Sequence, residues 1–267
     1  MQKERIDMPY LYETHLHTCQ ASLCGVSKGS DYISYYKELG YSGIIVTDHF
    51  FNGNSCIDRA LAWEQKIELF CTGYEDAKKE GDRLGLPVFF GWECNFDMDE
   101  YLIYGLDKEW LLTHPEMMEW DHITHFEEIT KAGGLVVQAH PFRQRGYMNC
   151  INLHPYQCHA WEIANAGNMT DHNQLAYRYA KEHNIPMTVG SDIHKTNTVD
   201  LYAMAFDEPL TDIHDYVTRV KAGTGYSLQI PDTIRQWDEN IATHLPLYFF
   251  DKENNRKHIT DLKKLFE

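Results

Sequence analysis

Short apolar runs recur along the chain, and five of them end in polar side chains of the kinds that bind metals. The runs lie in residues 10–18, 43–50, 88–96, 134–143 and 186–195. The side chains at their ends are imidazoles and carboxylates: His15, His17, Asp48, His49, Glu93, His140, Asp192 and His194. Such groups hold zinc, manganese or iron in proteins. One ending of this kind would be an accident, whereas five predict strand ends that converge on a hydrolytic metal centre.

Helical patterns alternate with these runs. We expect helices at 30–40, 125–134, 171–184 and 211–223 and one or two within 56–84, with caps at Ser30 or Asp31 and at Asp171. Further strands are expected at 99–107, 159–166 and 203–210. Alternating strands and helices imply a parallel sheet, and six or seven such units with polar carboxyl ends imply a closed β/α barrel. A doubly wound sheet is the competing fold, but no GxGxxG motif follows the first strand.

The chain length suits one large domain. We expect a single barrel domain over residues 1–267, with 225–267 packing on the outside of the barrel. The amino terminus lacks the apolar stretch of a signal peptide, and no run is long enough to cross a membrane. The seven cysteines are odd in number and scattered, without a CxxC motif. These features predict a reduced, cytoplasmic protein.

Acidic residues dominate the charge, with 40 acidic and 24 basic side chains and a formal net charge of −16. This balance argues against anionic membranes and against nonspecific binding of nucleic acid, which requires clustered lysine and arginine. A small phosphorylated substrate is therefore favoured, and bound cations would supply the positive charge that attracts it. The sequence leaves the oligomeric state open.

Two motifs place a pair of candidate ligands on one strand face. His15-Leu16-His17 and Asp192-Ile193-His194 each separate two ligands by one residue, and alternate residues of a strand point to the same side. The alternative for each pair is a solvated polar strand face. Two such pairs at two strand ends favour a shared ion.

Glu93, His140 and Arg143 each allow two interpretations. Burying the carboxylate of Glu93 without a partner would be costly, so it forms a salt bridge or is shared between two cations. His140 precedes Pro141, which ends its strand. Arg143 lies just beyond and either clamps a phosphate or pairs with a surface acid. Asp48 and His49 face opposite ways, so one is expected to be a ligand and the other to orient a neighbouring imidazole.

In this order and at strand ends, the motifs HLHT (15–18), TDH (47–49), WE (92–93), AHP (139–141) and SDIH (191–194) resemble the PHP (polymerase and histidinol phosphatase) family of metallo-phosphoesterases. The resemblance runs from about His15 to His194. It implies a distorted seven-stranded β/α barrel that holds up to three divalent ions and hydrolyses phosphate esters. Residue by residue, it implies ions on these three sets: His15, His17, Glu93 and Asp192; Glu93 and His140; His49 and His194.

The chain departs from the family at two positions. Glu100 stands in the frame where the family has a histidine, and either Glu100 or Asp99 is a substitute oxygen ligand. Cys24 is the nearest candidate to complete the third site as a thiolate, the alternative being a small apolar filler. Glu162 and Asn165 end a strand at the same rim and are expected to support the ligands, and His172 is a further candidate for the pocket lining.

The expected activity is metal-dependent hydrolysis of a small phosphate ester with two to three ions of zinc, manganese or iron. The candidate catalytic residues are Asp192, which would accept a proton besides binding metal, Arg143, which would stabilise the phosphoryl group, and His194. Hydrolysis of an amide or C–N bond, or a noncatalytic metal-binding module, are the alternatives.

Overall fold

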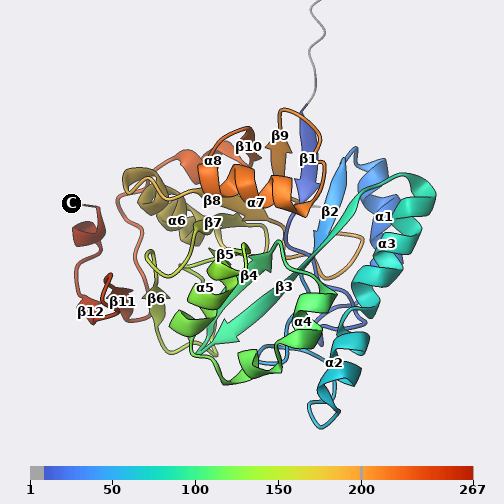
Figure 1. The fold of residues 1–267 in the computed structure, drawn as a ribbon. Coiled ribbons are helices and arrows are strands. Elements are labelled where there is room, and N and C mark those ends of the chain that lie inside the picture. The colour runs from blue at the N-terminus through green and yellow to red at the C-terminus, as the bar shows by residue number, and fades with distance from the viewer. Residues whose placement is uncertain (1–8, 199–200, 267) are drawn as a thin grey trace, which may run out of the picture.

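A curved sheet of nine strands forms the centre of the described chain, residues 9–198 and 201–266 of this computed structural model (Figure 1). In their order across the sheet the strands are β10 (Tyr226–Gln229), β9 (Ala203–Phe206), β1 (Tyr10–Glu13), β2 (Gly43–Val46), β3 (Val88–Phe96), β4 (Asp99–Tyr104), β5 (Leu135–Gln138), β7 (Ala160–Asn165) and β8 (Met187–Gly190). A parallel bridge between Leu16, beyond β1, and Ile193, beyond β8, nearly closes the sheet. The predicted α/β barrel is therefore present, but the predicted count of seven strands is not confirmed.

The expectation of a parallel sheet is wrong for part of the barrel. β4 runs antiparallel to both β3 and β5, and β9 runs antiparallel to β1 and β10. The reason is local at β3–β4, where only Asp97 and Met98 join the strands, with φ of 50° and 78°. Two successive left-handed residues are typical of a tight hairpin turn, and a parallel connection would need a dozen or so residues.

Helices cover the outside of the barrel (Figure 1). They are α1 (Gly29–Glu38), α2 (Trp63–Phe70), α3 (Thr72–Leu84), α4 (Lys108–Thr113), α5 (His122–Lys131), α6 (Thr170–Glu182), α7 (Ile213–Ala222) and α8 (Asp232–Arg235), with 3₁₀ turns η1 (Pro115–Glu119) and η2 (Leu262–Leu265). α3 and α7 end at Gly85 and Gly223 in the left-handed conformation, as glycine allows. Two predicted caps are wrong: α1 begins after Lys28, with Asp31 accepting from the Lys28 amide, and α6 begins after Met169.

Apolar side chains fill the barrel and the layer between barrel and helices. On β2, Ile44 and Val46 pack with Ile33 of α1 in one buried cluster, whereas Ile45 belongs to the larger cluster that contains Trp92. A strand covered on both faces is apolar at consecutive positions, which explains the uninterrupted run that marks β2 in the sequence.

The carboxyl-terminal segment contributes to two sheets. β10 forms one edge of the main sheet, and β11 (Leu247–Phe250) and β12 (Arg256–Ile259) join β6 (Ile151–Leu153) in a separate three-stranded sheet beside the barrel (Figure 1). No helix among the described residues is long and apolar enough to cross a membrane.

Candidate metal centre

The bridge that closes the barrel brings the two ligand-pair motifs together. Leu16 pairs with Ile193, and both side chains are buried in the cluster beneath α1. Their neighbours therefore face the barrel interior. The Nε2 atoms of His15 and His17 lie 3.1 Å apart, and Asp192 Oδ1 lies 3.6 Å and 3.1 Å from them, respectively. His194 Nε2 lies 3.8 Å from the same oxygen.

The carboxylate of Glu93 lies between imidazoles on two sides. A parallel bridge with His49 extends the β2–β3 pairing and places the two side chains together, with His49 Nδ1 2.8 Å from Oε2. His17 Nε2 lies 3.5 Å from Oε2, and Nε2 of His15 and of His140 each lie 3.4 Å from Oε1. Each oxygen thus faces two rings, which is the arrangement that a bridging carboxylate requires.

Glu100, rather than Asp99, faces this cluster. Its Oε2 lies 3.4 Å from His140 Nε2, because the Ala139 amide donates to the Glu100 carbonyl and aligns the two strand ends. Asp99 points to the other side of β4, where His154 and Asn152 donate to it. The alternation of side chains along a strand separates the two candidates.

Arg143 is buried and held in place. Its guanidinium donates to Asn168 Oδ1 at 2.8 Å, Asn165 Oδ1 at 3.0 Å and Asp192 Oδ2 at 2.6 Å. Burial raises the pKa of Asp192, but the nearby His15 and Arg143 outweigh it and hold that pKa well below its usual range. The surface ion pair considered for Arg143 is therefore not what the structure shows.

Cys24 lies beside the imidazoles of His49 and His194. Burial raises the pKa of its thiol, but hydrogen bonds with His194 and His49 outweigh burial and lower it to about 7. The thiol lines the same cavity as these two imidazoles. Cys24 is in the expected place for a ligand, although His17 is the third member of the compact group that contains His49 and His194.

A second layer of polar residues lies behind the candidate ligands and orients their side chains. Asp48 accepts from Ser22 Oγ at 2.6 Å and from the Thr18 hydroxyl at 2.7 Å, and Ser22 Oγ lies 3.3 Å from His17 Nδ1. Glu162 Oε1 lies 2.8 Å from His15 Nδ1. Partners of this kind fix the ring orientation of metal-binding histidines.

Glu13 was missed in the sequence. Its carboxylate is fully buried and accepts from the amides of His15 and Ser191 and from the Tyr36 hydroxyl. An acid within an otherwise apolar strand was the signal that would have identified it.

Several buried polar atoms of this cluster lie in imidazole–carboxylate contacts but form no hydrogen bond of acceptable geometry. They are Oε1 and Oε2 of Glu93, Nδ1 of His49 and Nε2 of His140. Leaving such atoms unpaired is unfavourable, and metal coordination would satisfy all of them. Three compact groups of possible ligands occur among the described residues: His15, His17 and Glu93; His49, Glu93 and Glu100; His17, His49 and His194. The residues present therefore fit a centre of more than one ion.

Two members of the cluster have an unusual backbone. His140 and Asp192 have φ of 31° and 53°, a region that residues with a side chain seldom adopt. Strain of this kind is characteristic of functional sites, where the surrounding structure holds a side chain in a required direction.

The cluster opens into a cavity of about 720 Å³. Asn52, Asn95, Arg145 and Tyr147 are among the residues that line it. His172, the low-priority candidate, is buried on α6 and does not line this cavity.

Two comparisons of the sequence with known proteins each match part of the chain. The PHP-associated family, PHP_C, matches residues 170–224, from α6 to α7. The 5′-3′ exoribonuclease of Haemophilus influenzae is 35% identical over 82 residues, which are 28% of this chain and only 30% of that protein.

Two solved structures resemble the fold. A protein of Bifidobacterium adolescentis assigned as a metal-dependent phosphoesterase has a TM-score of 0.52 at 15% identity, covering 79% of this chain and 96% of its own. PsfC of Pseudomonas syringae has a TM-score of 0.50 at 16% identity, covering 85% of this chain and 94% of its own. These similarities support the barrel fold.

Proposed function

We propose that this chain belongs to the PHP (polymerase and histidinol phosphatase) family and is a metal-dependent phosphoesterase that hydrolyses small phosphate esters at a centre of two or three divalent ions. The observation that carries the proposal is Glu93, a buried carboxylate whose two oxygens lie between four imidazoles without a hydrogen bond of acceptable geometry.

The ligands divide into three sets, two of which share Glu93. His15, His17, Glu93 and Asp192 would hold one ion, Glu93, His140 and Glu100 a second, and His49, His194 and Cys24 a third. Divalent ions in such a centre activate water and neutralise phosphoryl oxygens.

Protein groups beside the ligands would position the ester for attack by water. Arg143 lines the cavity with its guanidinium fixed by three side-chain oxygens, so it offers donors to a phosphoryl oxygen with little loss of side-chain freedom. Asp192 lies between Arg143 and the imidazoles, and the low pKa that they impose keeps it an anion that would bind metal. His194, whose side chain is 33% exposed, lies at the solvent edge of the centre, where it would help to hold an ion.

A small ester suits the charge of the molecule better than a long nucleic acid does. Arg143 and Arg145 are the cations among the residues that line the cavity, and the whole chain carries −16. Polyanion binding needs an extended basic surface. The exoribonuclease similarity covers too little of that protein to transfer its substrate, so RNA is a competing substrate for the assay to decide.

The decisive experiment joins metal analysis with a substrate screen. Protein purified without chelator should contain two to three divalent ions per chain and release phosphate from small monoesters. One ion or fewer after reloading with zinc, manganese or iron would overturn the multinuclear centre. Turnover of RNA oligonucleotides alone would overturn the substrate class, and turnover of amides alone would overturn phosphoester hydrolysis.

A further inference from the structure

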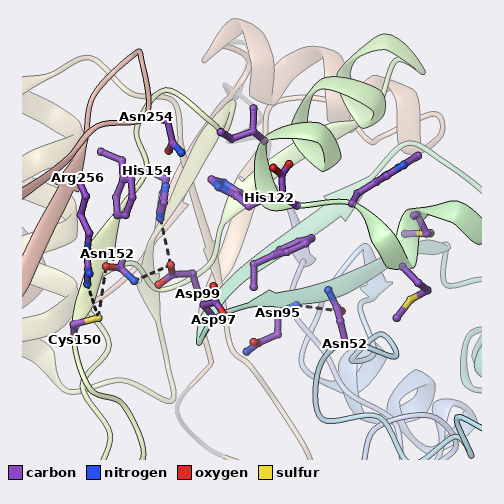
Figure 2. A pocket seen from close by; sticks show the side chains of 17 residues that line it. Asn52, Asn95, Asp97, Asp99, His122, Cys150, Asn152, His154, Asn254 and Arg256 are labelled. Carbon is purple, nitrogen blue, oxygen red and sulfur yellow. Dashed lines mark hydrogen bonds and ion pairs between the residues drawn. The ribbon is translucent and has the colours of Figure 1, made fainter.

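A second cavity, of about 570 Å³, lies on the other side of the β3–β4 hairpin (Figure 2). Glu100 lines the metal-centre cavity, and the preceding residue, Asp99, lines this one, because consecutive strand residues face opposite ways. Asn52 and Asn95 line both cavities. The second cavity is therefore a neighbour of the metal centre, but apart from these two asparagines it is lined by other residues.

His154 lines this cavity, and its ring has a buried nitrogen without a hydrogen-bond partner. Its Nε2 lies 3.2 Å from the Asp99 carboxylate, its side chain is 6% exposed and its Nδ1 has no partner (Figure 2). Burial lowers the pKa of this imidazole to about 4, so the ring is neutral at neutral pH. Since Nε2 donates to Asp99, Nδ1 carries a lone pair.

His122 and Asn254 add two more acceptors. Burial and the nearby His154 lower the pKa of His122 to about 3, and its ring hydrogen-bonds the backbone of Gln157. Its buried Nε2 is without a partner and is thus the unprotonated nitrogen. Asn254 Oδ1, also buried, has no donor. The unsatisfied atoms of the lining are acceptors, so the missing partner is a hydrogen-bond donor.

The charge of the lining selects among donors. Asp97, Asp99 and Asp121 line the cavity, against a single guanidinium, that of Arg256. Asp97 and Asp121 alone outnumber Arg256. This balance repels anions and favours a cation over a neutral hydroxyl compound.

We propose that this cavity binds an organic amine, whose ammonium group donates to the acceptors of His154, His122 and Asn254. The aromatic rings of Phe96, Trp120 and Phe250 line the same space and would pack against the hydrocarbon part of the amine. The inference rests on this cavity and not on the proposed phosphoesterase activity.

The test is calorimetric titration of the metal-loaded protein with spermidine, at an ionic strength that suppresses nonspecific attraction. Metal ions bound to the carboxylates of the metal centre prevent spermidine from binding there. Asn254 has a φ of 61°, so Asn254→Gly removes the acceptor without straining the backbone. This change should raise Kd about tenfold, the effect of one hydrogen bond to a charged group.

Two variants that each remove one negative charge complete the test. Asp97→Asn should raise Kd about threefold, as expected for an exposed charge, whereas Asp207→Asn, the same change on an exposed residue outside the cavity, should leave Kd unchanged. The absence of saturable binding, an equal Kd in Asn254→Gly and wild type, or equally tight binding of 1,8-octanediol would each overturn the proposal. Because the readout is binding, it is valid for an inactive enzyme too.

Discussion

At the scale of single residues, the buried carboxylate of Glu93 connects the two halves of the candidate centre. Its oxygens face different imidazoles, His15 and His140 on one side and His17 and His49 on the other. A carboxylate that serves two ions affects both when it is altered, whereas a ligand of one ion affects one.

Glu93→Gln should therefore lower the occupancy of two ions together and abolish turnover. The amide keeps the shape but loses the charge that attracts both cations. Elemental analysis and phosphate release measure the two effects. Glu116→Gln, the same substitution on an exposed residue of η1, should retain metal and activity. Near-native metal and turnover in Glu93→Gln would make Glu93 an ordinary buried acid.

Cys24→Ser should weaken one ion selectively, because the thiol lies against His49 and His194 and not against His140. Thiolate favours zinc over manganese or magnesium. Cys24→Asp should consequently recover activity best with manganese. Metal titrations of both variants measure this, with Cys56→Ser as the exposed control. If Cys24→Ser keeps the full ion content and merely unfolds more readily, Cys24 is a packing residue.

At the scale of elements, the packing of α3 against the loop after β1 holds the second polar layer in place. A Cβ added to Gly73 would lie 2.9 Å from Asp48 Oδ2 and collide with the Thr18 hydroxyl that donates to Asp48. Asp48 in turn holds Ser22 beside His17. A helix position and an imidazole of the metal centre are thus linked through contacts.

Gly73→Ala should destabilise the protein by about 1–3 kcal/mol, the usual cost of overpacking. It should also weaken metal binding, since Thr18 and Asp48 must move. Urea unfolding and metal titration measure the two effects. Gly146→Ala, where the added methyl group meets open space, should change stability by less than about 0.5 kcal/mol. Equal stability of the two variants would show that α3 accommodates the added methyl group without loss of stability.

At the scale of the whole molecule, buried neutral histidines away from the metal centre make stability depend on pH. Burial lowers the pKa of His125 to about 3 and that of His159 to about 4. In the unfolded chain histidine has a pKa of about 6.5. Below that value these two histidines bind protons in the unfolded chain but stay neutral in the folded protein. The folded state therefore loses stability as pH falls.

Each such imidazole should cost up to about 1.4 kcal/mol of stability per pH unit between about 6.5 and its folded pKa. His125→Leu should therefore reduce the pH dependence of the unfolding free energy by one proton between pH values of about 6 and 4. His214→Leu, on an exposed residue of α7, should not reduce it. Urea unfolding of both variants in one metal state measures the slopes, and equal slopes would contradict the assignment.

Sequence and tertiary structure determined different parts of this protein. Apolar runs, helix stops and the polar residues at strand ends are local patterns, so the barrel class, most elements and the group of candidate ligands could be predicted from them. Metal binding by these residues stays a prediction.

Tertiary structure alone decided which candidates meet. The choice of Glu100 over Asp99, the pairing of Leu16 with Ile193 and the antiparallel course of β4 depend on register and closure across distant segments. The support of His15 by Glu162 and the second cavity depend on them as well. A sequence shows which way a side chain alternates along its own strand, but the distance between two strand ends is set by how all the strands pack.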